Sequence, residues 1–168
     1  MLSKNIHNFI ACDAEYEAAD IVLFGAGLDG TTSFSPGTRF CPSEIRNERF
    51  GIETYSPYQD KDMLDYSYFD SGDLELSFGS TNRVIADIAM RTDRILTDGK
   101  IPFMIGGEHL VTLGAVMAVT EKIDDLYIIH FDAHADLRDD YIGQKLSHAC
   151  VLRRCHDIVG DGHIFQFG

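Results

Sequence analysis

Short apolar runs alternate with segments of helical periodicity along this chain of 168 residues, and the alternation restricts the fold more than any other feature. Residues 20–25, 101–105 and 126–129 have the length and the β-branched or aromatic composition of buried strands. Between them, apolar side chains recur at helical spacing over 84–96 and over 110–122. Strand and helix in alternation predict an α/β domain with a mostly parallel, buried central sheet. Ligands of such sheets bind beyond the carboxyl ends of the strands, so the residues that follow the apolar runs are candidates for a site.

Local signals predict the remaining elements. Proline at position 42 is typical of the first turn of a helix, because its missing N–H would have no partner there. A further helix is expected over 147–159 and a further strand over 163–168. The polar and aromatic segment 51–77 is expected to be irregular, with a short strand around 63–65.

The charge of the chain restricts its partners. It has 14 basic and 27 acidic residues and a formal net charge of −13 at pH 7. Nucleic acids and anionic membranes attract positive patches, so neither is expected as a partner, whereas a cationic ligand suits this charge. No apolar run has the length of a membrane span, and the N-terminus lacks the apolar core of a signal peptide. The four cysteines have no framework spacing, so we expect reduced thiols and a cytoplasmic protein.

Two carboxylates and an imidazole follow the third apolar run. Side chains alternate along an extended chain, so Asp132, His134 and Asp136 would project to the same side if the strand continued. Only alanines separate them, and burying such carboxylates without a counter-charge is costly. A bound cation would remove that cost. The alternative is a polar turn at the end of the strand, capped by an aspartate.

This motif and the segment 106–109, Gly-Gly-Glu-His, together resemble the ureohydrolases, the family of arginases and agmatinases. The resemblance covers essentially the whole chain, and further segments resemble the agmatinase branch: 29–34, 36–40, 53–58, 72–74, 136–138 and 146–149. Cys41 stands where a small residue is expected, and Glu108 stands where many members have Asp. We interpret both as variation within the branch.

The resemblance implies a fold, a site and a reaction. The fold would be the three-layer arginase-like fold. His109, Asp132, His134 and Asp136 would be ligands of a binuclear manganese centre, and His148 would be the proton shuttle. Oxygen-rich donor sets with some imidazole suit Mn²⁺. The expected reaction is hydrolysis of agmatine, a small cationic guanidino substrate, to urea and putrescine, by a homo-oligomer in the full-length form. For His148 the alternative is a histidine at a helix start without a catalytic role.

The later part of the family pattern is the main departure. Family members are longer and take their last two metal ligands from a second Asp-x-Asp motif, for which Asp157 and Asp161 have the wrong spacing. We therefore expect residues 1–168 to form a single, incomplete ureohydrolase domain without the C-terminal strands, and expect no measurable turnover from this form alone. Two alternatives remain open: hydrolysis of another guanidino compound such as guanidinobutyrate, and a non-catalytic remnant or interaction domain.

The other histidines and cysteines predict no further site. His130 directly follows the third apolar run, in the same expected buried strand, where a hydrogen-bonded core histidine is expected. Cys150, Cys155 and His156 lack the fourth ligand that a structural zinc site needs.

Overall fold

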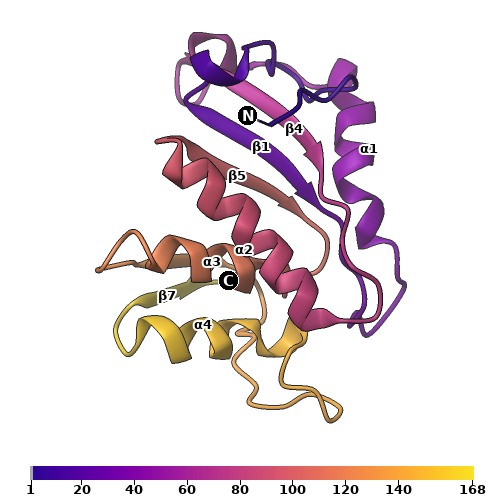
Figure 1. Cartoon of the computed structure of the whole chain (residues 1–168), viewed down its shortest axis with the longest axis vertical. Helices are drawn as coiled ribbons and strands as arrows, with labels where there is room; N and C mark the ends of the chain where they lie inside the picture. The colour runs from indigo at the N-terminus through magenta and orange to yellow at the C-terminus, as the bar shows by residue number, and fades with distance from the viewer. Residues whose placement is uncertain (1) are drawn as a thin grey trace.

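A three-stranded parallel sheet forms the centre of the structure, a computed structural model that describes residues 2–168 (Figure 1). Its strands are β1 (Ile21–Ala26), β4 (Tyr68–Asp73) and β5 (Ile101–Gly106), in the order β4-β1-β5. The apolar strand β1 is buried along almost its whole length. It runs parallel to β5, with Ile21 opposite Ile101 and Ala26 opposite Gly106. The segments that follow β1 and β5 therefore leave the sheet at the same edge.

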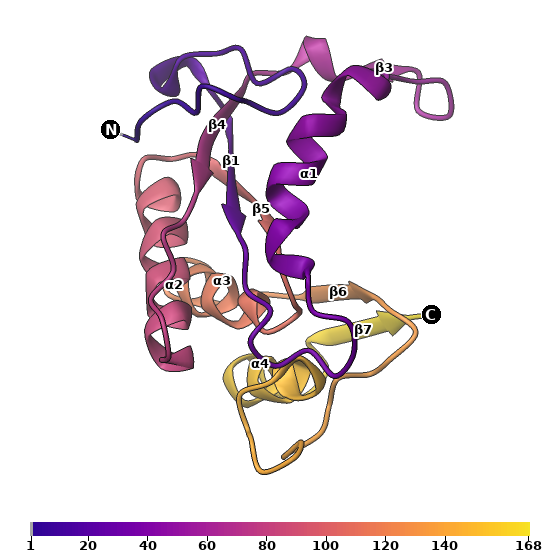
Figure 2. The ribbon, with the colours of Figure 1, turned by 90° about the vertical axis from the view of Figure 1, so that its right-hand side faces the viewer.

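Helices cover both faces of this sheet. Helix α1 (Cys41–Asn47) lies on one face, and α2 (Thr81–Thr97) and α3 (Val111–Thr120) lie on the other (Figure 2). On the α2 side, Ile88 is completely buried in a cluster that includes Ala26 of β1. This arrangement confirms the predicted three-layer α/β fold for the first sheet.

A second parallel sheet contains β6 (Ile128–Phe131) and β7 (Ile164–Phe167), and helix α4 (Val151–Val159) lies against it. Ile128 and Ile164 pack toward α3 and α4. The opposite face exposes four large apolar side chains: Ile129, Phe131, Phe165 and Phe167. The third apolar run is therefore buried on one face only, and the prediction of a fully buried strand is wrong there.

The two sheets do not pair with each other within residues 2–168, whereas the sequence predicted one central sheet. β1 is the only hydrogen-bonded neighbour of β5 among the described strands, and β7 is the only neighbour of β6. Packing of α3 against α4 joins the two parts instead, through a cluster that contains Leu113, Val116 and Leu152. The strands are parallel as predicted, but they form two sheets joined by helices.

The predicted helices and the last strand are confirmed. α1 begins next to Pro42, α2 begins after Ser80, and the backbone N–H of Arg83 donates to Ser80 Oγ at 3.4 Å. Gly99, which follows α2, has a φ of +74°, a conformation that glycine adopts without strain.

The segment between α1 and β4 differs from the prediction. It contains a short antiparallel pair of strands, β2 (Tyr55–Ser56) and β3 (Lys61–Asp62). The predicted strand at Met63–Asp65 is wrong: these residues form a 3-10 helix, because the Asp62 carboxylate accepts the Leu64 N–H at 3.0 Å. The other 3-10 helices are η1 (Tyr16–Ala18), η2 (Thr38–Phe40), η3 (Glu48–Gly51) and η5 (His148–Cys150).

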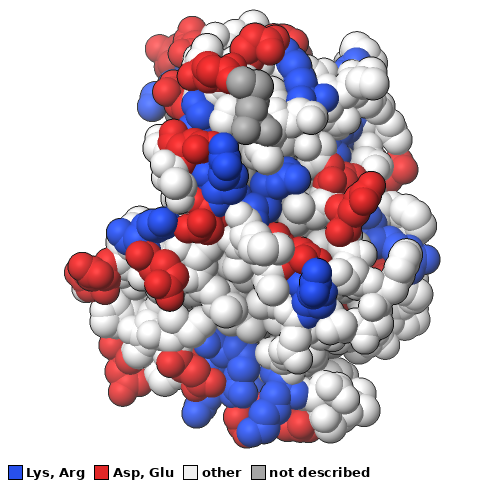
Figure 3. Space-filling model, in the orientation of Figure 1, with Lys and Arg blue, Asp and Glu red and all other residues white. Residues whose placement is uncertain are grey.

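The surface charges are intermixed on the face shown in Figure 3, and basic side chains gather at the lower end, where α4 lies. None of the helices in the described part of the chain combines the length and the apolar character needed to cross a membrane.

Candidate metal centre and adjoining cavity

His109 is placed by a close backbone approach at the end of β5. A Cβ atom at Gly107 would lie 2.0 Å from the carbonyl oxygen of Leu28, so only glycine fits at this position. The Gly107 N–H donates to Ala26 O at 3.1 Å, and the Glu108 N–H donates to Leu28 O at 2.7 Å. The glycine at 107 thus allows the backbone after β5 to approach the backbone after β1 closely. These contacts fix the backbone that carries His109 beside the loop that follows β1.

The two aspartates come together through a turn rather than along a strand. β6 ends at Phe131, and the Asp132 carboxylate accepts the backbone N–H of His134 at 2.8 Å. Asp136 has a positive φ of 51°, and its carbonyl oxygen accepts the N–H of Leu152 in α4 at 3.0 Å. The strand does not continue to Asp136, so the condition under which Asp132, His134 and Asp136 would align is not met. A turn closed by the Asp132 carboxylate follows β6 instead, as in the alternative considered from the sequence.

His109, Asp132 and Asp136 form a cluster that could hold a metal ion. Each offers one ligand atom, and these atoms all lie within 4.8 Å of one another. His109 Nδ1 lies 2.7 Å from Asp136 Oδ2 and 3.3 Å from Asp132 Oδ2. The Asp136 side chain is 6% exposed and that of Asp132 14%, so both carboxylates are largely removed from water. Two hard oxygen donors and one imidazole fit a divalent ion of the manganese type.

The pKa of the Asp132 carboxyl is lowered from its ordinary value. The main cause is the hydrogen bond from the His134 N–H, and the neighbouring imidazoles of His109 and His130 contribute in the same direction. Burial acts in the opposite direction but does not reverse the shift. Asp132 is therefore held as a carboxylate, the form in which it can bind a cation.

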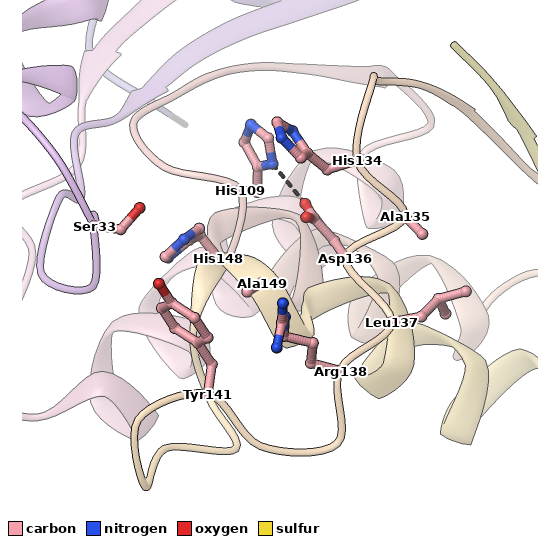
Figure 4. A pocket seen from close by; sticks show the side chains of 10 residues that line it. All are labelled: Ser33, His109, His134, Ala135, Asp136, Leu137, Arg138, Tyr141, His148 and Ala149. Carbon is pink, nitrogen blue, oxygen red and sulfur yellow. Dashed lines mark hydrogen bonds and ion pairs between the residues drawn. The ribbon is translucent and has the colours of Figure 1, made fainter.

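His134 lies outside this three-residue cluster. Its side chain is 83% exposed, and its Nδ1 lies 3.5 Å from Asp132 Oδ1. It points into the adjoining cavity near His109 (Figure 4). The structure thus brings three of the four predicted ligands together and leaves the fourth beside them.

His130 is closer to the candidate centre than the sequence suggested. Its Nε2 lies 3.5 Å from Asp132 Oδ2, and its Nδ1 lies 2.9 Å from the side-chain nitrogen of Gln166 on β7. Position 130 is two residues before Asp132, so the alternation of the strand would have indicated that the two side chains share a face.

A cavity of about 740 Å³ opens beside the cluster (Figure 4). Residues from three parts of the chain line it: Ser33, His109, the segment 134–138, Tyr141, His148 and Ala149. Its size is within the range of small-molecule sites. Among the described residues, Arg138 forms no ion pair, and its guanidinium lies 5.4 Å from the centre of the Tyr141 ring.

His148, the predicted proton shuttle, lines this cavity at the start of η5. The rings of His148 and Tyr141 are packed edge to face, with their centres 5.4 Å apart. The backbone N–H of His148 donates to Thr31 Oγ1 at 3.0 Å, and its Nδ1 lies 3.4 Å from the same oxygen. The sequence did not indicate the contact with Thr31, which lies in the loop between β1 and η2.

Comparisons with known proteins identify the family of the chain. Residues 19–168 match the model of the Arginase family. The chain is 46% identical over 160 residues to the agmatinase of Bacillus subtilis (strain 168), covering 95% of this chain and 55% of that protein. It is 34% identical over 158 residues to the guanidinobutyrase of Pseudomonas aeruginosa, covering 92% of this chain and 50% of that protein. The crystal structure of agmatine ureohydrolase of Thermoplasma volcanium superposes with a TM-score of 0.87 at 36% identity, covering 96% of this chain and 54% of that one.

The chain belongs to the arginase family, and the predicted resemblance and fold class are confirmed. It spans about half the length of the curated relatives that it matches.

Proposed function

We propose that this chain provides part of the active site of a manganese-dependent agmatine hydrolase. The observation that carries the proposal is the convergence of His109, Asp132 and Asp136 at the edge of a cavity that His148 also lines. The similarity to the agmatinase of Bacillus subtilis over 95% of the chain supports this substrate class. The products would be urea and putrescine.

The ligand set proposed from the sequence is retained, with His134 as the fourth ligand. His134 is exposed and lies outside the cluster, so a rotation of its side chain is needed for it to join the other three. Mn²⁺ is the weakest binder among the divalent ions of its row, so it needs a site rich in oxygen donors. Two of the three groups that converge here are carboxylates. A bound ion would supply Lewis-acid activation of the attacking water.

The residues of this chain would bind the substrate and move its proton. The guanidinium group of the substrate is cationic, and the net charge of −13 favours its approach. Imidazole is the side chain best suited to carrying a proton to the departing amine, and His148 is the cavity histidine that is not among the proposed metal ligands. Tyr141 faces His148 and narrows the same side of the cavity.

Arg138 favours a second candidate substrate, guanidinobutyrate. Its guanidinium lines the cavity and has no ion pair among residues 2–168, so it could bind the carboxylate of such a substrate. Agmatine carries an ammonium group at the equivalent end, which Arg138 would repel. The similarity to the guanidinobutyrase of Pseudomonas aeruginosa supports this alternative.

Urea release in the presence of Mn²⁺ tests the proposal, with agmatine, guanidinobutyrate and arginine compared side by side. The measurement should be made on this chain and on a form extended with the C-terminal half of a relative. We expect release of urea from agmatine by the extended form, little or none by the 168-residue chain, and loss of activity in a His148→Ala variant. No release from any guanidino compound by the extended form would favour the non-catalytic alternative, a remnant or interaction domain.

The cytoplasmic location and the homo-oligomeric state remain proposals. All four cysteines are free thiols in the structure, and a reducing compartment is where such thiols persist.

A further inference from the structure

Glu108 is a buried carboxylate next to His109 that turns away from the candidate metal cluster. The residue is 3% exposed, and its oxygens accept two hydrogen bonds from one residue, Thr31. The backbone N–H of Thr31 donates to Oε1 at 2.6 Å, and the Thr31 hydroxyl donates to Oε2. A buried carboxylate needs such donors, and here both come from the loop that also reaches His148.

The Thr31 hydroxyl connects Glu108 to His148. A hydroxyl has one proton to donate and two lone pairs that accept. The carboxylate oxygen takes the proton, because a carboxylate can only accept. One lone pair of Thr31 Oγ1 accepts the backbone N–H of His148 at 3.0 Å. The other faces His148 Nδ1 at 3.4 Å, so a hydrogen bond between them requires that Nδ1 carries a proton.

We propose that Glu108 and Thr31 are positioning residues that hold neutral His148 in the tautomer with its proton on Nδ1. The chain of donors is His148 Nδ1–H to Thr31 Oγ1, and Thr31 Oγ1–H to Glu108 Oε2. His148 Nε2, which forms no hydrogen bond within residues 2–168, keeps its lone pair for the cavity. The tautomer of a histidine is set by the hydrogen bond of its other nitrogen, and here that nitrogen faces an acceptor.

The consequence for proton transfer rests on the proposed function. A free lone pair on Nε2 can accept a proton in the cavity, and the resulting imidazolium would donate from Nδ1 along a chain that ends in a carboxylate. Charge-assisted chains of this kind are stronger than neutral ones. The proton taken up at Nε2 can then be given to the departing amine without any movement of the ring.

The tautomer can be measured directly on the 168-residue chain by nitrogen-15 NMR of the imidazole rings, without any activity. The spectrum is recorded at about pH 8.5, above the ordinary imidazole pKa of about 6.5, and a His148→Gln variant assigns the signals of this ring. We expect the wild type to show the pattern of a protonated Nδ1 and an unprotonated Nε2. An Nε2–H pattern in the wild type would overturn the proposal.

Two substitutions test the hydrogen-bond chain itself. Thr31→Val removes the hydroxyl at nearly constant shape, so the Nδ1–H pattern should be lost, whereas Thr31→Ser should retain it. Glu108→Gln should reverse the direction of the hydrogen bonds between position 108, Thr31 and His148, so the Nδ1–H pattern should be lost here too. The Gln oxygen must accept the Thr31 N–H, so its NH₂ group donates to Oγ1, and the hydroxyl proton is then free to turn toward His148 Nδ1.

A matched control separates this effect from disturbance of the loop. Thr32 is the neighbouring threonine, and its hydroxyl donates to Asp29 O at 3.2 Å rather than to either partner in the chain. Thr32→Val should leave the His148 pattern unchanged. If Thr31→Val folds and keeps the Nδ1–H pattern, or if Thr32→Val changes it equally, the assignment is wrong. A failure to release urea would overturn the proposed function alone, because the tautomer is read without turnover.

Discussion

His109 Nδ1 lies 2.7 Å from Asp136 Oδ2, although the two residues are separated by 27 positions and follow strands of different sheets. The contact joins an imidazole that is half exposed to a carboxylate that is almost buried. A pair of this kind can be satisfied by a proton or by a metal ion. The distinction can be made by experiment.

Mn²⁺ should raise the thermal midpoint of the chain, because a ligand that binds only the folded state stabilises it by mass action. At a concentration of 100 times the dissociation constant, the gain would be about 2.7 kcal/mol. Asp132→Asn should abolish the shift, since Asp132 contacts His109 and accepts the N–H that forms the turn. His134→Ala, at an exposed position, should reduce the shift less than Asp132→Asn. Equal shifts in all three proteins, measured by calorimetry, would exclude this cluster as the binding site.

Gly107→Ala should destabilise the chain and displace His109. The new methyl group would lie 2.0 Å from Leu28 O, and backbone atoms cannot move aside as a flexible side chain can. Overpacking of this kind typically costs about 1–3 kcal/mol. Gly30→Ala is the matched control beside the same residue, because its Cβ would meet only Leu28 Cδ1 at 3.7 Å. Denaturant unfolding of both variants gives the comparison, and similar losses would contradict the argument.

Arg46→Ala should cost about 3–5 kcal/mol, the usual penalty for leaving a buried charge without its partner. Arg46 is 3% exposed and donates to both oxygens of Asp70, at 2.7 and 2.9 Å, and to Asp73. Asp70 is completely buried, so its carboxylate would be left without a positive partner. Arg94→Ala, which removes the exposed pair with Asp98, should destabilise the chain much less, because water screens an exposed ion pair. A small loss in Arg46→Ala would mean that water enters the site.

Stability should fall at alkaline pH because of Cys155. Burial raises the pKa of this thiol to about 12, whereas a thiol in the unfolded chain ionises near its ordinary pKa of about 8.5. The folded state therefore keeps its proton over a range in which the unfolded state loses it. The contribution is fully present below about pH 8.5 and decreases as the pH rises toward 12, amounting to a loss of about 2 kcal/mol by pH 10. Denaturant unfolding at pH 8 and pH 10 should show a smaller decrease for Cys155→Ala than for the wild type.

The exposed apolar face of β6 and β7 should promote self-association of this chain. Phe131 is 79% exposed and Phe167 55%, and their rings stack at 5.6 Å. Apolar patches of this kind on a sheet favour contacts with other molecules. Phe131→Gln should lower the apparent mass in light scattering at a given concentration. A wild-type chain that is monodisperse and monomeric would contradict this prediction.

Much of the fold could be predicted from the sequence because its signals are local. The strand β1 follows from an unbroken apolar run, and the ends of α2 follow from Ser80 and Gly99. Strand β4 could not be predicted, because Asp70, Gly72 and Asp73 are residues typical of turns. Asp70 is tolerated inside a sheet because Arg46 of α1 neutralises it and the backbone N–H groups of Phe9 and Gly72 donate to it. The contacts with Arg46 and Phe9 join segments far apart in the sequence.

The candidate site could be predicted in part for the same reason. The motifs around His109 and Asp132 are short and specific, so the sequence placed their residues in one site. The sequence offered the bend at Asp132 only as an alternative to a continued strand, since the choice depends on whether the aspartate accepts the His134 N–H. The contact between Thr31 and Glu108 links residues 77 positions apart, and no local pattern reports it.

The division of the strands into two sheets has a mechanical consequence for the candidate centre. His109 is attached to the first sheet, whereas Asp132 and Asp136 are attached to the segment that follows the second, and helix packing joins the two sheets. An ion held by all three residues would connect the two sheets directly. Loading with metal should then slow amide hydrogen exchange at the ends of β5 and β6 together, so that the exchange rates at these two strand ends show whether the centre is filled.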